Sequence, residues 1–168
     1  MIHHRIALGL AALVCAASAL FAQEAAISLG TSSFDKEQPV EVTADQLSVD
    51  QSTGHAVFDG NVLVVQGEMR MTAPQMTVIY SQNEDGANDG IEELVAVGGV
   101  TFVSPTDEAE SDTANYVVET GFVTLTGNVL LIQGPNAISG DKLVVDLEAG
   151  TGVMEGRVRT IFNTQSNN

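Results

Sequence analysis

Apolar and polar residues alternate along short segments of this 168-residue chain from Gln38 onward. Valine, threonine, isoleucine and leucine dominate these segments, and glycine, asparagine and aspartate separate them. Alternation places successive side chains on opposite faces, so each segment predicts a β-strand with one apolar and one polar face. No segment has a sustained helical apolar period, which argues against amphipathic helices. The clearest alternating sets are Val40/Val42, Met76/Val78/Tyr80, Tyr116/Val118 and Leu143/Val145/Leu147.

A longer repeat is superimposed on this alternation. The sequence Gly-Asn-Val-Leu at 60–63 returns at 127–130, an offset of 67 residues. Related segments begin at 98 and 156, so the steps between the four are 38, 29 and 29 residues, and the long first step contains a polar insertion at 81–90. Regular repeats of this length predict stacked β units, with each glycine at a turn or bulge.

The repeat also predicts how the apolar faces are buried. A single repeat cannot bury its apolar face, whereas stacked repeats bury it by facing two sheets across a shared interior. The expected fold is all-β, an elongated β jelly roll or solenoid of stacked antiparallel strands over residues 38–162. Its end strands, Gln38–Thr43 and Arg157–Phe162, are expected to be edges that can accept a strand from another molecule.

The first 22 residues have the layout of a secretory signal peptide. A basic start at 3–5 precedes an apolar run at 6–17, and a small-residue exit ends at Ala22. Cleavage is expected after Ala22, with Ala19 as the alternative. An uncleaved membrane anchor is the competing interpretation, although the apolar run is shorter than the roughly 20 residues of a membrane span. Because the one cysteine lies in this leader, the exported chain would contain none. Residues 23–37 are expected to be a flexible segment and 163–168 a C-terminal tail.

Charge and motif content narrow the classes of function. Six basic residues against 22 acidic residues give a formal charge of −16, which becomes −17 when Arg5 leaves with the leader. Such an acidic chain is not expected to bind nucleic acid, because nucleic-acid binding needs a basic surface. The sequence contains no G-x-S-x-G elbow, phosphate-binding loop or H-E-x-x-H motif. We therefore predict no enzyme activity, no catalytic residue, no metal site and no cofactor.

The remaining polar residues of interest favour structural roles. His55 follows a Thr-Gly pair and is expected to be a solvated turn residue. Asp45, Asp112 and Asp141 recur near predicted strand starts, in step with the repeat. This recurrence favours turn or ladder-end roles over paired carboxylates for glycosidic chemistry.

Four segments occur in a characteristic order and spacing. They are residues 39–47 with Asp50, the Gly-Asn-Val at 60–62 leading to Gln66-Gly67, Tyr116 followed by Leu-Thr-Gly-Asn at 125–128, and Gly-Asp-Lys-Leu at 140–143. Together with the leader, they resemble the family of periplasmic lipopolysaccharide-transport proteins (LptA/OstA-like). The chain departs from the family in its strongly acidic balance and its short C-terminal tail.

The resemblance implies a fold and a function. The fold would be a half-open, twisted β jelly roll whose members stack end to end as a bridge between the inner and outer membranes. The protein would lie in the periplasm and accept lipopolysaccharide from the periplasmic subunit of an inner-membrane export complex. It would pass the lipid to the outer-membrane translocon, with the acyl chains of lipid A in an apolar groove and with head-to-tail self-association.

Inward-facing apolar side chains are the expected lipid contacts. By match to the family's lipid-facing positions these are Val40, Val42, Phe102, Tyr116 and Val118. Strand alternation adds five positions for which core packing and lipid contact are both open, namely Phe58, Met76, Val78, Leu143 and Val145. The expected partner contacts at the two edges are Gln38, Glu41, Thr43, Arg157 and Arg159. Charged residues at these edges also fit protection against unwanted strand pairing.

Three other interpretations stay open. A membrane-anchored periplasmic subunit of the same exporter requires an uncleaved N-terminus. A small β-solenoid that acts on polysaccharide requires carboxylates converging on one outward face. A purely structural assembly protein would bind no lipid.

If the protein does bind lipopolysaccharide, its charge repels the headgroup phosphates, so binding should barely weaken with added salt.

Overall fold

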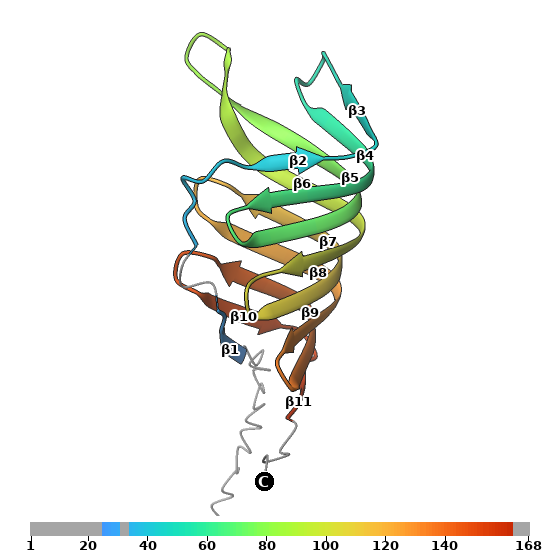
Figure 1. Cartoon of the computed structure of the whole chain (residues 1–168), viewed down its shortest axis with the longest axis vertical. Helices are drawn as coiled ribbons and strands as arrows, with labels where there is room; N and C mark the ends of the chain where they lie inside the picture. The colour runs from blue at the N-terminus through green and yellow to red at the C-terminus, as the bar shows by residue number, and fades with distance from the viewer. Residues whose placement is uncertain (1–24, 31–33, 163–168) are drawn as a thin grey trace, which may run out of the picture.

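The computed structural model describes residues 25–30 and 34–162, which form one antiparallel sheet of eleven strands. The strands are β1 (Ala25–Ser28), β2 (Glu41–Thr43), β3 (Gln46–Val49), β4 (Ala56–Gln66), β5 (Met69–Gln82), β6 (Asn88–Val103), β7 (Asp107–Val117), β8 (Phe122–Gln133), β9 (Asn136–Asp146), β10 (Thr151–Glu155) and β11 (Arg159–Ile161). Their order is β1-β10-β9-β8-β7-β6-β5-β4-β2, with β11 also paired to β9 and β3 to β4. Figure 1 shows the strands stacked as rungs along the long axis. The predicted all-β fold of stacked antiparallel strands is confirmed.

The segment that precedes residue 38 contains regular structure. Residues 23–37 were expected to be flexible, yet β1 lies within them and pairs with β10 along its whole length. The predicted signal peptide at 1–22 and the predicted tail at 163–168 lie outside the described residues. Within residues 25–30 and 34–162, no helix is long and apolar enough to cross a membrane.

The long strands bend at bulges and so contribute to two layers. The pairing register shifts at 59–62 in β4, 97–100 in β6 and 126–129 in β8, which are the repeated glycine segments. A bulge adds a residue to one strand, which kinks it and increases its twist. Layer A contains the strand halves that end at the turns 67–68, 104–106 and 134–135, and layer B contains those that end at 83–87, 118–121 and 147–150. These two sets of turns are called rim A and rim B.

A repeated aspartate supports the bends. The Asn61 side-chain amide donates to the Asp45 carboxylate at 2.7 Å, and Asn128 donates to Asp112 at 2.8 Å. Gly60 has a φ of 77°, and a Cβ at this position would lie 2.5 Å from the Asp45 Oδ2 atom. Because both conformation and space exclude a side chain, the bend requires glycine. The structural role predicted for the recurring aspartates is confirmed.

The apolar faces of the two layers meet in one continuous interior. Alternate residues of β4, β5, β7 and β8 are buried, as the period of two predicted. Within the described residues, the buried apolar side chains belong to a single cluster that extends along the sheet from β4 to β1. The largest buried apolar side chains are Tyr116, Met71, Met76, Leu94, Leu125, Leu131, Leu143, Leu147 and Met154.

The N-terminal segment crosses from one layer to the other. It begins as β1 on β10, which belongs to layer B, and ends as β2 on the part of β4 in layer A. In Figure 1 it runs alongside the turns, from the end of the sheet that holds β10 to the end that holds β4. We call residues 27–30 and 34–40 the strap.

Candidate functional site

All ten residues predicted to contact lipid belong to the apolar interior. Six of them are no more than 3% exposed, namely Met76, Val78, Phe102, Tyr116, Leu143 and Val145. The other four are partly buried and pack against the same cluster, namely Val40, Val42, Phe58 and Val118. The structure therefore brings both predicted groups together from the strap, β2 and the two layers. Their contact with lipid stays a prediction.

Polar side chains interrupt this apolar interior along layer A. The buried polar residues are Gln66, Ser104, Asp107 and Ser111. Gln66 and the partly buried Gln133 each end a strand just before a turn glycine. None of these residues was among the predicted site residues. The available signal was a glutamine that repeats with the period of 67 residues.

Gln66 joins the strap to both layers. Its Nε2 atom donates to the main-chain oxygens of Lys36 and Gln38, each at 2.9 Å. Its Oε1 atom accepts from the Tyr116 hydroxyl at 2.6 Å, and this bond crosses the interior because Tyr116 lies in layer B. Burial raises the pKa of Tyr116 to about 12. Tyr116 is therefore a neutral hydroxyl donor at physiological pH.

Asp107 forms a second anchor at rim A. Its Oδ2 atom accepts from the Gly30 main-chain N–H at 2.8 Å and from the hydroxyls of Thr106 at 2.7 Å and Ser104 at 3.2 Å. Its Oδ1 atom accepts from the Gln133 amide at 2.7 Å. Burial raises the pKa of Asp107, but these hydrogen bonds outweigh it and bring the pKa below its usual value. The strap is thus held by an ionised carboxylate.

Further bonds tie the strap to both rims. The Gln133 side chain donates to the main-chain oxygen of Ser28 at 2.8 Å. At rim B, the Leu29 main-chain N–H donates to the oxygen of Gly150 at 2.7 Å. The strap's Lys36 forms an ion pair at 3.2 Å with Glu148, which also lies at rim B. The open side between the layers is therefore bridged from rim to rim.

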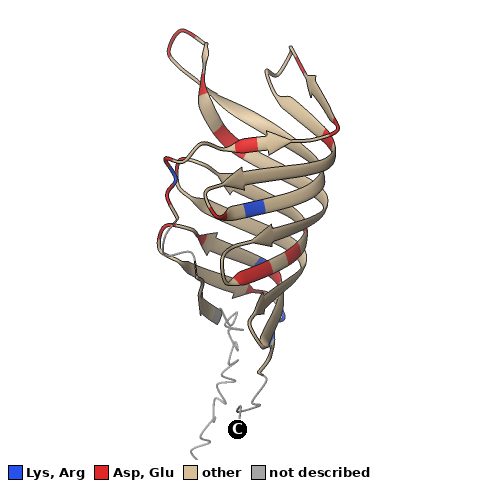
Figure 2. Ribbon diagram, in the orientation of Figure 1, with Lys and Arg blue, Asp and Glu red and all other residues tan. Residues whose placement is uncertain are grey.

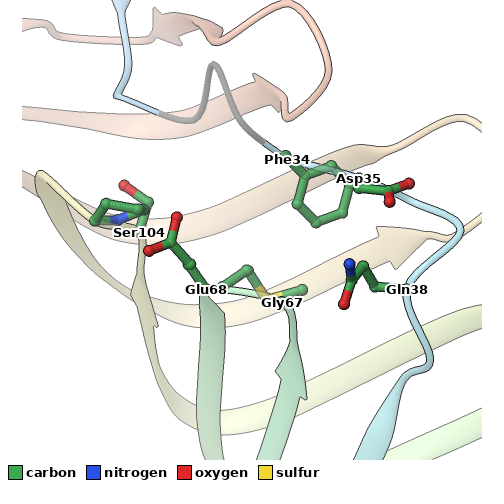
Figure 3. A pocket seen from close by; sticks show the side chains of 8 residues that line it. Phe34, Asp35, Gln38, Gly67, Glu68 and Ser104 are labelled. Atoms are coloured by element: carbon green, nitrogen blue, oxygen red, sulfur yellow. The ribbon is translucent and has the colours of Figure 1, made fainter.

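A cavity of about 270 Å³ lies between the strap and rim A. Figure 3 shows Phe34 of the strap over this space, with Gln38 beside it. Gly67, Glu68 and Ser104 approach from the turns of rim A. The lining is completed by Asp35, Met69 and Pro105. The strap therefore leaves a space beside apolar side chains at this point of the rim.

Both ends of the sheet expose apolar side chains. At one end, Leu47 and Val49 of β3 are 55% and 60% exposed. At the other end, Ile161 and Phe162 are 53% and 70% exposed. Among the described residues, the strands at these ends have an unpaired side, so each can accept a strand from another molecule.

The residues predicted to contact partners are all exposed but differ in their surroundings. Glu41 and Thr43 lie on β2, whereas Gln38 precedes that strand and lines the cavity. Arg159 begins β11. Arg157 lies before β11 with a φ of 43° and donates to the Asp141 carboxylate at 2.7 Å. This hydrogen bond lowers the pKa of Asp141, and Arg157 takes the place that asparagine has at two other bends.

Acidic residues dominate the charged groups of the molecule. Figure 2 shows aspartate and glutamate spread over strands and turns, with few lysines and arginines among them. The described part of the chain holds no cluster of three or more histidine, cysteine, aspartate or glutamate residues that could bind a metal. The arrangement is thus suited to burial of apolar groups, and its surface repels anions.

Comparisons with known proteins point to one family. The family described as LptA/(LptD N-terminal domain) LPS transport protein matches residues 41–151. The chain is 31% identical over 121 residues to the lipopolysaccharide export system protein LptH of Pseudomonas aeruginosa. This alignment covers 68% of this chain and 66% of LptH. It is 32% identical over 115 residues to the lipopolysaccharide export system protein LptA of Escherichia coli K12. This alignment covers 65% of this chain and 60% of LptA.

The fold matches a solved structure as well. This is the crystal structure of LptH, the LptA homologous periplasmic component of the lipopolysaccharide transport device from Pseudomonas aeruginosa. The two structures superpose with a TM-score of 0.65 at 25% sequence identity, over 77% of this chain and 98% of that one.

Proposed function

Because the chain belongs to the LptA/(LptD N-terminal domain) family of lipopolysaccharide transport proteins, we propose that it is a periplasmic carrier that bridges the two membranes. The family consists of transport proteins rather than enzymes, so the protein's task is to bind and pass on the lipid. It accepts lipopolysaccharide from the periplasmic subunit of an inner-membrane export complex and delivers it to the outer-membrane translocon. A signal peptide cleaved after Ala22 brings it to the periplasm.

The observation that carries this proposal is the continuous apolar interior between two layers, whose strands join them along one side while the strap bridges the other. Once the layers or the strap move apart, such an interior can take up an acyl chain along its length. Burial of one CH₂ group contributes about 0.8 kcal/mol, so a chain of about twelve carbons would gain roughly 9–10 kcal/mol before the cost of ordering. The interior therefore recognises the acyl chains of lipid A.

The acidic surface supports the same mode of recognition. A formal charge of −16 over the whole chain repels the anionic phosphates of the headgroup. Binding should therefore depend on apolar burial and change little with ionic strength. Titration of labelled lipopolysaccharide at rising sodium chloride concentrations tests this, and a steep loss of affinity would instead indicate a basic headgroup site.

The two ends of the sheet support end-to-end assembly. One end exposes β2 and β3 and the other exposes β1 and β11, each with an unpaired strand side. Exposed apolar residues at both ends favour burial against another molecule. Head-to-tail contact of these ends would join the interiors of successive copies and, at the ends of the stack, those of the membrane partners.

Photo-crosslinking in living cells tests the lipid path. A photoreactive amino acid replaces Phe102, which is buried in layer A, or Val118, which is partly buried at rim B. Thr77 is the control, because it alternates on β5 with the buried Met76 and Val78 and therefore points outward. Lipopolysaccharide adducts are expected at the two inward positions and not at Thr77. Folded, exported protein without inward adducts would overturn the proposed function.

A further inference from the structure

We propose that the strap, residues 27–30 and 34–40, is an exchangeable cover that the lipid's acyl chains displace from the mouth of the interior. This inference rests on the proposed function and adds a way in which lipid binding is controlled. It concerns the closed arrangement seen here, in which Met76, Tyr116 and Leu143 have no exposed surface. An acyl chain can reach these side chains only after the layers or the strap have moved.

The strap places apolar side chains where an acyl chain would lie. Ile27 and Leu29 are 8% and 7% exposed and belong to the interior cluster. Phe34 and Val40 pack against the same cluster. The strap and the lipid therefore compete for the same apolar surface, because the apolar groups of either one can cover it and exclude water.

The bonds that hold the strap suit an element that detaches. Those to Gln66, Asp107 and Gln133 all involve main-chain atoms of the strap. The Lys36–Glu148 pair is solvent-accessible and therefore weak. Release leaves buried polar groups without partners, so the strap stays closed until apolar burial by a ligand offsets that loss.

The cavity beside Phe34 indicates where displacement begins. It lies between the strap and rim A, with Met69 and Pro105 in its lining. A chain end that entered here would lie next to Phe34 and could then extend under the strap. Because a ligand shifts an equilibrium only through its differential affinity, uptake should depend on how firmly the strap is closed.

A reversible covalent lock tests the inference. A Cβ on Gly30 would lie 2.8 Å from the Cβ of Thr106. In the double variant Gly30→Cys/Thr106→Cys, the two Cβ atoms would need to move apart by about 1 Å to reach the Cβ–Cβ distance of a disulfide. The mature protein without its leader has no other cysteine, so the bond is unique. Fluorescently labelled lipopolysaccharide is the probe, and the single variant Gly30→Cys is the control.

The oxidised lock should bind the probe at least about tenfold more weakly than the same protein after reduction. The control should be indifferent to oxidation and reduction. Equal binding by the oxidised and reduced forms would overturn the strap inference and leave the proposed function intact. Absence of binding by the wild-type protein would overturn the proposed function itself.

A second pair of variants loosens the strap and covers the case in which the disulfide does not form. Gly30→Ala puts a Cβ 1.8 Å from the Thr106 Oγ1 atom, which forces the strap away from rim A. The double variant Gly30→Ala/Thr106→Gly removes the clash. The single variant should take up the probe several-fold faster than wild type and exchange its strap amides faster, and the double variant should restore both rates. A single variant with faster amide exchange and unchanged uptake would contradict the inference.

Discussion

The hydrogen bonds of Gln66 provide a prediction with a calculable size. Gln66→Leu replaces this polar side chain with an apolar one of similar size and removes three hydrogen bonds, to the oxygens of Lys36 and Gln38 and from the Tyr116 hydroxyl. Each contributes about 0.5–1.5 kcal/mol, and leucine recovers part of the loss through apolar burial. The free energy of unfolding should fall by roughly 2–4 kcal/mol.

A double-mutant cycle separates this bond network from general damage to the core. Tyr116→Phe removes one bond and leaves the Gln66 Oε1 atom unpaired, which should cost about 1–2 kcal/mol. The free energy of unfolding lost in the double variant Gln66→Leu/Tyr116→Phe should be about 1 kcal/mol smaller than the sum of the two single losses, because the shared bond is lost only once.

Urea denaturation monitored by circular dichroism provides the measurement, with the outward-facing substitution Thr77→Val as the control within about 0.5 kcal/mol of wild type. Strict additivity of Gln66→Leu and Tyr116→Phe would refute the bond across the interior. A loss below about 0.5 kcal/mol for Gln66→Leu would refute the role of Gln66 in holding the strap.

Four further perturbations have expected outcomes. The pKa of Tyr116 rises from 10.0 to about 12 on folding, so the stability that its neutral hydroxyl contributes is complete below pH 10.0 and is lost as the pH rises towards about 12. Urea denaturation at increasing pH should show the free energy of unfolding fall by up to about 2 kcal/mol, and Tyr116→Phe should abolish this fall. The lowered pKa of Asp107 contributes stability above its unfolded value of 3.8 that disappears as the pH falls through its native pKa, so Asp107→Asn should flatten the acid limb of stability against pH. Gly127→Ala forces a side chain onto a φ of 83° and within 2.4 Å of the Asp112 Oδ2 atom, and should lower the free energy of unfolding by about 1–3 kcal/mol in the same urea assay. Phe162→Asp should weaken self-association in sedimentation velocity without changing the circular dichroism spectrum. Unchanged association would show that this end of the sheet is not the surface through which copies associate.

The sequence predicted the layers and faces of this protein because both depend on local patterns. Alternation placed Met76, Val78, Leu143 and Val145 on a common interior face, since a period of two fixes which side chains point the same way. The offset of 67 residues located the bends, because each bend needs a residue without a Cβ at the same point of the repeat.

The strap could not be predicted in this way. Its bonds use main-chain atoms of residues such as Gly30 and Lys36, so no side-chain pattern reveals them. The pairing of β1 with β10 joins distant parts of the chain, and a short strand of four residues has no distinctive period. Arg157 was placed on the last strand by alternation, but its left-handed backbone and its bond to Asp141 put it at a bend. The alternation from Arg157 to Arg159 passes through this bend, so it does not describe one continuous strand.

The pairing of β1 with β10 has a consequence for the order of folding. Ala25 is paired with Met154, so β1 near the N-terminus must wait for β10 near the C-terminus before it can form its ladder. The hairpins from β4 to β9 need only neighbouring segments and can form earlier, because short loops cost less entropy to close. The chain therefore completes its open-sided body first and fastens its own N-terminal segment across it last. A newly exported molecule would pass through a stage in which its interior is still accessible.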